Sequence, residues 1–424
     1  MIRKSILMMS LLLAGLSMMG QTSREELAAT PEKTGGVYYA YPAPSADGNT
    51  PAPKGYKPFY ISHYGRHGSR YLISGRDYTT VYDLFVKAHK AGALTPLGED
   101  VCQRLAEVCR EGAPTSGDLS PLGRRQQRGI AERMFRAFPE VFEKGDSISA
   151  RSTIVPRCAM SMVAFGDRLK ELNPDMAILY EMSDRYMDYL NYHAEESNRF
   201  THGERGPLAE EMRKFKEENT RPERLVASLF ADADFVRKSV NPSNLMWGLY
   251  WIASDMQDME TKVSFYDLFT ADELFGLWQS NNYHFYAGNA NHAAGNGIVV
   301  ANASNLLRNI VESADEAVAN PKIAATLRFG HDGNVIPLAA ILRLEDCNVA
   351  LSDPAEVYKH WADFKIVPMA ANIQIIFFNK KNGTTDDVLV KFMLNEKEVK
   401  IPVSTDCYPF YRWKDVRNFY RQLF

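Results

Sequence analysis

The chain has 424 residues, more than one ordinary core needs, so two domains or one large domain with an insertion is expected. Its formal net charge is −3 in an otherwise ordinary globular composition, and loss of the N-terminal Arg3 and Lys4 would make the chain more acidic still. Such a balance does not indicate a nucleic-acid-binding surface, and any attraction of an anionic small molecule must come from a local cluster of cations.

The first twenty residues are typical of a signal peptide. Arg3 and Lys4 precede an apolar run over 6–19, and polar residues follow. The run is short for a membrane span, and the first cysteine, Cys102, lies too far along for lipid attachment. We expect residues 1–20 to be removed on export, which leaves a periplasmic or secreted protein without a stable membrane anchor. A retained N-terminal anchor is the alternative.

The pattern that follows is typical of an α/β domain. Residues 21–57 are a leader rich in proline and glycine, which we expect to wrap the surface or to be partly mobile. Over 58–183, short apolar runs alternate with amphipathic helices predicted at 77–111, 120–138 and 156–172.

Two similar strings, LTPLG at 94–98 and LSPLG at 119–123, look like an internal repeat. In each, a hydroxyl side chain (Thr95 or Ser120) precedes a proline, which is a helix-start signal. We interpret both as caps, with a binding role as the lesser alternative.

The most informative motif is Arg66-His67-Gly68-Ser69-Arg70, directly after a strand predicted over 59–63. An imidazole between two guanidinium groups, on a glycine turn, suits attack on the phosphorus of a bound phosphate. Ligands of open α/β sheets bind at the carboxyl ends of strands, where this motif lies. A simple strand-end turn with solvent-facing arginines is the alternative.

Two further strand ends carry polar residues of the same kind. A strand predicted at 147–150 is followed by Arg151, with Arg157 near the start of the next helix. A strand predicted at 324–329 is followed by His331 and Asp332, before a helical run over 335–342. We therefore expect Arg151, His331 and Asp332 to meet the RHGSR turn at one sheet edge.

Taken together, RHGSR, ARST with Arg157 behind it, and GHDG resemble the histidine phosphatase superfamily, in its acid phosphatase and phytase branch. Longer segments such as YKPFYISHYGRHGSRY and RSTIVPRCAMSMVAF are similar to bacterial relatives of the multiple inositol polyphosphate phosphatases. The resemblance runs from about Lys54 to the C-terminus.

The resemblance implies a phosphomonoester hydrolase that acts through a phosphohistidine on His67, without metal or cofactor. Asp332 would give a proton to the leaving alcohol, so an acidic pH optimum is expected. The resemblance also implies the side chains that hold the phosphate oxygens: Arg66, Arg70, Arg151 and His331.

One departure bears on the substrate. Inositol polyphosphate phosphatases of this kind generally carry His-Ala-Glu where this chain has His331-Asp332. A His193-Ala194-Glu195 string does occur, but it lacks the strand-then-helix context, and we interpret it as an exposed segment. Phytate is therefore in doubt as a substrate, while sugar phosphates and other small organic phosphates stay open.

Residues 184–319 lack strand alternation and predict a helical cap inserted into the α/β domain. We interpret the aromatic stripe that contains Trp247, Trp251 and Trp278 as core rather than as a substrate platform. In the glycine- and asparagine-rich loop that follows, His292 is interpreted as structural, with a place in the pocket left open, as it is for Arg157.

The last part of the chain returns to the sheet. Strands are predicted at 372–379 and within 388–403, joined through a hairpin signal, and a closing helix over 413–424. The expected fold is thus an α/β three-layer sandwich around a mostly parallel sheet, with a catalytic domain made of 58–183 plus 320–424.

Rival interpretations remain. His63 and His67 are four apart, a metal-pair spacing on a helix, but here they lie on a strand that runs into a turn, and loss of activity to a chelator would be needed to favour a metal. An exported binding protein for phosphorylated ligands on a degenerate phosphatase scaffold is the second rival, and a mutase is a weaker third.

The chain has five cysteines, an odd number, so at least one is unpaired within the chain. Free thiols are favoured over one disulfide. The five are Cys102, Cys109, Cys158, Cys347 and Cys407.

Overall fold

The computed structural model describes residues 22–44, 48–143, 146–201, 206, 208–320 and 322–424. The predicted signal peptide lies outside these residues. Within them, no helix combines the length and the apolarity that crossing a bilayer requires.

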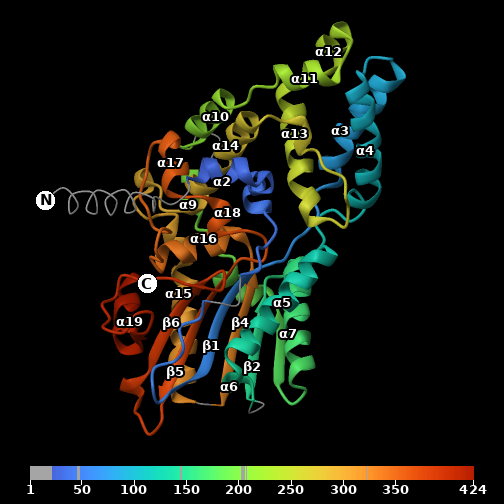
Figure 1. The fold of residues 1–424 in the computed structure, drawn as a ribbon. Helices are drawn as coiled ribbons and strands as arrows, with labels where there is room; N and C mark the ends of the chain where they lie inside the picture. The colour runs from blue at the N-terminus through green and yellow to red at the C-terminus, as the bar shows by residue number, and fades with distance from the viewer. Residues whose placement is uncertain (1–21, 45–47, 144–145, 202–205, 207, 321) are drawn as a thin grey trace, which may run out of the picture.

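A single twisted sheet forms the centre of the α/β part (Figure 1). Its strands are β1 (Tyr56–Arg66), β2 (Ser147–Ser152), β3 (Ala177–Met182), β4 (Ile323–Gly330), β5 (Asn372–Lys380), β6 (Leu389–Leu394), β7 (Lys397–Glu398) and β8 (Tyr411–Arg412). They lie in the order β3-β2-β4-β1-β5-β6-β7, with β8 also paired to β6. The strands from β3 to β1 are parallel and those from β5 onward antiparallel, so the prediction of a mostly parallel sheet is confirmed.

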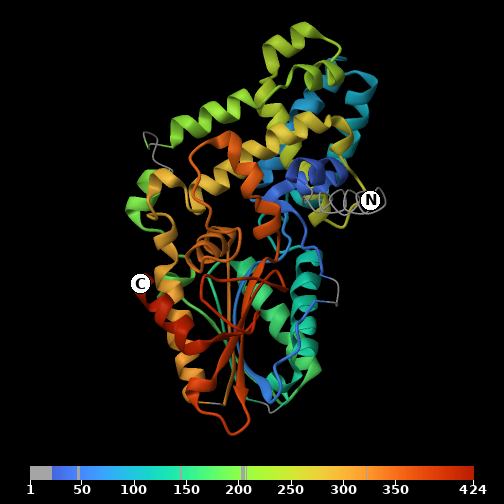
Figure 2. The same ribbon diagram turned by 60° about the vertical axis from the view of Figure 1, so that its left-hand side comes forward.

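Helices cover both faces of this sheet, as Figures 1 and 2 show. One face is covered by α5 (Pro121–Ala137) and α7 (Pro156–Leu172), and the other by α15 (Ser304–Ala319), α16 (Asp332–Ile341) and α19 (Trp413–Tyr420). The predicted three-layer sandwich is therefore confirmed. Because β1 is covered on both sides, its residues form an almost continuous buried run, typical of a central strand in a parallel sheet.

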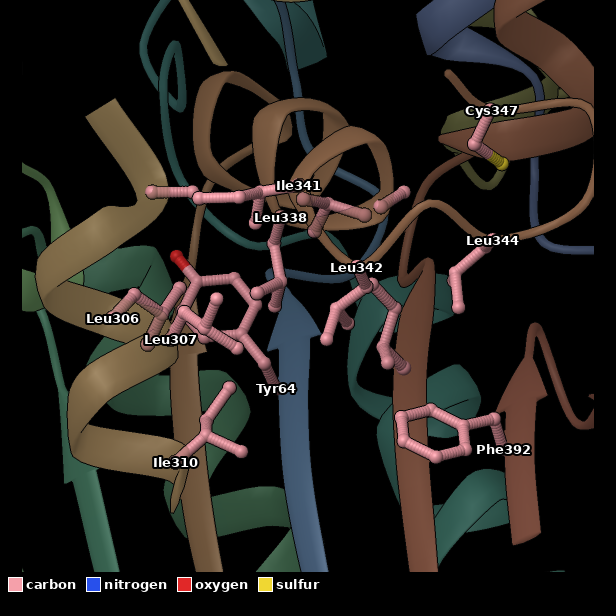
Figure 3. Close-up of a cluster of buried hydrophobic side chains, with 14 of the residues drawn as sticks. Tyr64, Leu306, Leu307, Ile310, Leu338, Ile341, Leu342, Leu344, Cys347 and Phe392 are labelled. Atoms are coloured by element: carbon pink, nitrogen blue, oxygen red, sulfur yellow. The ribbon is translucent and has the colours of Figure 1, made fainter. Parts of the chain in front are cut away.

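The core on the α15 side lies directly beneath the candidate site. Tyr64 of β1 packs among leucine and isoleucine side chains of α15 and α16 (Figure 3). Leu307 and Leu342 are fully buried there. Truncating such a side chain to alanine costs about 2–5 kcal/mol, so this cluster fixes where α16 begins relative to β1.

A helical part stands above the carboxyl ends of the strands (Figure 1). Its longer helices are α3 (Gly75–Lys90), α4 (Pro96–Gly112), α10 (Ala209–Glu218), α13 (Pro242–Asp255) and α14 (Ala271–Asn289). Shorter helices in the chain are α6 (Pro139–Phe142), α8 (Met187–Leu190), α9 (Glu195–Thr201), α11 (Glu223–Leu229), α12 (Ala233–Ser239), α17 (Pro354–His360) and α18 (Asp363–Ile366).

The helical part includes segments from both sides of the predicted boundary. Helices α3 and α4 share an apolar core with α11 and α13, whereas α15 packs on the sheet. The division into a discontinuous α/β domain and a helical cap stays a proposal. In such a division, packing would group α3 and α4 with the cap and α15 with the α/β domain. The caps predicted at Thr95 and Ser120 are confirmed, because each side chain accepts the backbone N–H three residues on.

The leader differs from its prediction as a surface segment. It forms α2 (Ser23–Ala29) and a 3₁₀ helix, η1 (Pro31–Tyr38), in which residues 34–37 are buried. Gly36 has φ +59°, and a Cβ there would lie 2.3 Å from Asp363 Oδ2, so only glycine fits this approach. The Val37 carbonyl in this segment accepts from the Arg66 side chain, so the leader contacts the RHGSR motif.

Candidate active site

The RHGSR turn lies where the carboxyl ends of β1, β4 and β2 meet. Arg66 ends β1 opposite Gly330 of β4, and the backbone N–H of His67 donates to the Gly330 carbonyl at 3.0 Å. The Thr153 N–H donates to the Phe329 carbonyl, which ties the end of β2 to β4. Parallel register thus brings residues from distant parts of the sequence to one edge, as predicted.

His67 is 2% exposed and has a defined tautomer. Its Nδ1 lies 2.8 Å from the Gly68 carbonyl oxygen, which only accepts, so Nδ1 carries the proton and Nε2 keeps a lone pair. Burial, followed by the charges of Arg66, Arg157 and Arg70, lowers the pKa of His67 well below its ordinary value. The lowered pKa favours the neutral imidazole, which is the nucleophilic form.

The LSPLG helix start supports this turn by close packing. A Cβ on Gly68 would lie 2.4 Å from the Gly123 carbonyl oxygen, so the motif needs glycine there. Gln126 Oε1 accepts from the Ser69 N–H, and Gln127 Nε2 donates to the Arg66 carbonyl. Beyond its role as a cap, the second LxPLG string therefore holds the turn in place.

Arg66 joins the turn to Asp332. Its guanidinium is fully buried, donates through Nη1 to the Val37 and Val367 carbonyls, and donates through Nη2 to Asp332 Oδ2 at 2.8 Å. Burial alone would raise the pKa of Asp332, but Arg66, His331 and Arg70 together lower it below its ordinary value. The carboxylate is thus ionised when paired with Arg66.

Arg70, the last residue of the RHGSR turn, contacts Tyr38 of the leader. It donates to the Tyr38 hydroxyl at 3.1 Å and to the Tyr71 carbonyl at 2.9 Å, and its guanidinium carbon lies 4.7 Å from the Tyr38 ring centre. Sequence reasoning missed Tyr38, because nothing local in the leader links it to the motif.

Arg157 and Arg151 are placed differently relative to His67. Arg157 lies in the first turn of α7, and its charge lowers the pKa values of both His67 and His331. Arg151 instead forms an ion pair with Glu181 at 2.9 Å, and its guanidinium covers the Tyr186 ring on the β3 side. In this structure Arg151 is thus paired away from His67, whereas the charge of Arg157 acts on His67. The phosphate-holding roles stay proposals, and we propose Arg157 alongside Arg66 and Arg70.

The Nε atoms of three arginines around His67 share one feature. Each is buried and has no hydrogen-bond partner within the described part of the chain: Arg66, Arg70 and Arg157. Converging guanidinium groups with unused donors are the arrangement that a phosphate requires.

His331 faces His67 from the N-cap of α16. The two ring centres are 5.8 Å apart, and His331 Nε2 lies 3.1 Å from Thr153 Oγ1. Burial lowers the pKa of His331 to about 4. The charge of Asp332 raises this pKa, and the charges of Arg157 and Arg66 lower it further. His331 and Asp332 thus lie where the sequence placed them, at the end of β4.

Comparison with known proteins agrees with this geometry. A family model described as "Histidine phosphatase superfamily (branch 2)" matches residues 65–395. The chain belongs to this superfamily. It is therefore a histidine-type phosphatase, as the sequence motifs predicted, although no curated protein matches it.

Solved structures of the same fold include phosphatases and phytases of this branch. The Bifidobacterium longum multiple inositol polyphosphate phosphatase in complex with inositol hexasulfate has a TM-score of 0.72 at 18% identity, over 91% of this chain and 97% of that chain. A phytase from D. castellii has a TM-score of 0.66 at 16% identity, over 92% and 85%. The Hafnia alvei phytase apo form has a TM-score of 0.53 at 12% identity, over 88% and 98%. At these identities the likeness shows the shared histidine phosphatase fold.

Two cavities of this phosphatase open beside Asp332. One, of about 700 Å³, is lined by Arg70 and Asp332 and by side chains of η1, α10, α13 and α14. The other, of about 400 Å³, is lined by polar side chains that include His193, His284 and His331. His193 is exposed, as expected, and its segment forms part of the wall of this second cavity.

The tryptophans of the helical part belong to its core, and two of them also reach a cavity. Trp278 is fully buried and donates to Asp363, as the core interpretation predicted. Trp247 is buried in the apolar core shared by α3, α4, α11 and α13, and Trp251 packs against that core. Both also line the larger cavity, which periodicity alone could not show.

The remaining singled-out residues are structural. His292 is 3% exposed, lies 3.2 Å from the Tyr283 hydroxyl and lines neither of these cavities. His63 is buried between Phe165 and Phe329. Over the described residues, no group of three or more potential ligands could hold a metal ion. All five cysteines lie in the described part of the chain and are free.

Proposed function

We propose that the chain is an exported histidine acid phosphatase that hydrolyses organic phosphomonoesters through a phosphohistidine on His67. The observation that carries this proposal is the buried His67 imidazole, whose Nδ1 is bonded to the Gly68 carbonyl and whose pKa is lowered by burial and by the charges of Arg66, Arg157 and Arg70. Asp332, paired with Arg66, stands beside the same site.

The proposed reaction has two steps. In the first, His67 Nε2 attacks phosphorus, the bond to the ester oxygen breaks, and Asp332 gives its proton to the leaving alkoxide. In the second, the Asp332 carboxylate takes a proton from water, whose oxygen attacks phosphorus and releases His67 and inorganic phosphate. The arginines stabilise negative charge on the phosphoryl oxygens in both steps, and His331 donates to one of them.

Inositol polyphosphates such as phytate are among the candidate substrates. Support comes from the Bifidobacterium longum neighbour, whose structure contains inositol hexasulfate, and from neighbouring phytases. The His331-Asp332 pair departs from the His-Ala-Glu of the inositol polyphosphate phosphatases, so sugar phosphates and other small esters are equal candidates. Export to the periplasm or the medium rests on the N-terminal sequence alone.

The proposal is tested by phosphate release at pH 4 to 7 from phytate, glucose 1-phosphate and a chromogenic aryl phosphate. We expect release by the native chain and none by His67→Ala. A matched control is His89→Ala, since His89 is an exposed histidine that pairs with Glu99. Rapid quenching should trap an acid-labile phosphoenzyme in the native chain only, and full activity of His67→Ala would contradict the mechanism.

A second candidate function is binding of phosphorylated ligands without turnover. It is favoured by the Arg66–Asp332 ion pair, which lowers the pKa of the carboxyl group that must act as the acid. Calorimetry with inorganic phosphate and the three esters distinguishes the two functions. Tight binding of an ester that is never hydrolysed would favour the binding protein.

A further inference from the structure

The wall of the larger cavity contains a row of three aromatic rings that leads away from Arg70. The row, here called the aromatic strip, consists of Tyr38 from η1 and Trp251 and Trp247 from α13. Neighbouring ring centres are 5.6 Å apart from Tyr38 to Trp251 and 5.7 Å apart from Trp251 to Trp247. The rings are tilted against one another, by 46° between Tyr38 and Trp251 and by 38° between Trp251 and Trp247. A continuous aromatic wall, rather than one plane, therefore runs from Arg70 into the helical part.

Both ends of the aromatic strip are covered by cations, and its middle is not. The Arg70 guanidinium lies over Tyr38, and Lys216 Nζ lies 4.2 Å from the Trp247 ring centre. Of the described residues, no lysine or arginine makes such a contact with Trp251, which is partly exposed in the cavity wall. Trp251 is thus the ring best placed to receive a flat group.

The charges of this cavity do not suit a densely phosphorylated ligand. Arg213 lines it but already pairs with Glu210 and Glu217. Asp77 adds a carboxylate to the same wall. Each further phosphate would need its own cation to offset its desolvation, and beyond Arg70 and the paired Arg213 the described lining offers only Lys216, which already lies over the Trp247 ring.

One buried amide in the cavity has an unused donor. Asn281 is 5% exposed, and its Nδ2 has no hydrogen-bond partner among the residues that the structure describes. A buried donor of this kind costs free energy unless a ligand accepts from it. The cavity thus combines a flat apolar surface with a hydrogen-bond donor, which is the recognition chemistry of a heteroaromatic ring.

We infer that the preferred substrates are monophosphate esters whose alcohol carries a heteroaromatic ring, as nucleoside 5′-monophosphates do. The phosphate lies at His67, the ring stacks on Trp251, and a ring acceptor bonds to Asn281 Nδ2. This inference rests on the proposed function, since it assigns the leaving alcohol of that same reaction to the larger cavity.

The test compares adenosine 5′-monophosphate with ribose 5-phosphate, which have the same leaving 5′ oxygen and differ in the base. We expect the native chain to favour the nucleotide by about tenfold in kcat/KM, in line with stacking of one base on an aromatic side chain. Trp251→Leu, which keeps apolar volume without a flat ring, should abolish this preference, and Trp251→Phe should restore most of it. Tyr408→Leu, at an exposed aromatic residue that lines neither cavity, is the control.

A second readout does not depend on turnover. In the His67→Ala background, calorimetry should show tighter binding of the nucleotide than of ribose 5-phosphate, and Trp251→Leu or Asn281→Ala should remove the difference. Equal rates for the two esters in the native chain, or a preference for phytate over both, would overturn the inference and leave the phosphatase proposal intact. Absence of phosphate release from every ester, with equal binding of both ligands, would overturn both.

Discussion

Arg66 and Asp332, 266 positions apart in the chain, form an ion pair in which Nη2 lies 2.8 Å from Oδ2. The guanidinium is fully buried, and the carboxylate is 24% exposed toward the cavities. The pair lowers the pKa of Asp332, which is the opposite of what a proton donor needs. A phosphate bound to the same guanidinium brings negative charge beside Asp332 and raises its pKa, so we expect substrate itself to turn this carboxylate into an acid.

Replacement of Asp332 by asparagine should reduce kcat/KM by about 10²–10⁴-fold for an alkyl phosphate such as glycerol 3-phosphate. The loss should be much smaller for 4-nitrophenyl phosphate, because its phenolate leaves without a proton. Steady-state kinetics with both esters measures the difference. Asp272→Asn is the control, since Asp272 forms an arginine ion pair at an exposed position. Equal losses for the two esters would mean that Asp332 is not the proton donor.

The pH dependence of kcat/KM should report the pKa of Asp332 in the free enzyme, and that of kcat its pKa in the substrate complex. The acid form of Asp332 is present only below its pKa, which is lowered in the free enzyme, so kcat/KM should fall as pH rises through the acid range. The profile of kcat should hold to higher pH, because bound phosphate raises that pKa. Because the pKa of His67 is lowered, any acid limb from its protonation should lie at lower pH than for an ordinary histidine. Profiles that are flat, or that fall together, would contradict this account.

Local signals and strand order were enough to predict most of the fold and the meeting of His67, His331 and Asp332 at one sheet edge. The proline-containing helix starts at Thr95 and Ser120 depend only on neighbouring residues, and both are confirmed. The convergence of His67 with His331 and Asp332 follows from parallel pairing of β1 with β4, since like ends of parallel strands share one edge.

The rest depends on which way a side chain points and on contacts across the chain. Arg151 lies in β2 and Arg157 in the first turn of α7, and the sequence does not say which of them turns toward His67. The carbonyls that hold Arg66 come from Val37 and Val367, 29 and 301 positions away. No local pattern in the leader marks Val37 or Tyr38 as part of a site.

Arg157 and Arg151 provide a matched pair of substitutions. Arg157→Ala should lower kcat/KM by at least about 100-fold, as expected for loss of one preorganised donor to the phosphoryl group, and should weaken inhibition by inorganic phosphate. Arg151→Ala should change kcat/KM only a few fold, because Arg151 is committed to Glu181. Arg157→Lys should recover part of the rate, since it restores charge without the planar fork. A large loss in Arg151→Ala alone would restore the original assignment.

The pH dependence of stability should report on His63. Both of its ring nitrogens are buried and have no hydrogen-bond partner within the described residues, and burial, with Arg328, lowers the pKa to about 3. Below about pH 6.5 the His63 side chain binds a proton in the unfolded chain but not in the folded chain. The contribution of His63 to the free energy of unfolding is therefore fully present above that pH and is lost as pH falls.

Each such histidine contributes about 1.4 kcal/mol per pH unit to this loss between pH 6.5 and 4. His63→Leu removes one such contribution. The slope of the free energy of unfolding against pH should therefore be smaller in the variant than in the native chain by about that amount. This comparison of slopes does not depend on the absolute stability of the variant. Urea unfolding at pH 4.5, 5.5 and 6.5 measures it, with the exposed His89→Leu as control. Parallel slopes for His63→Leu and the native chain would show that His63 takes up a proton in the folded protein.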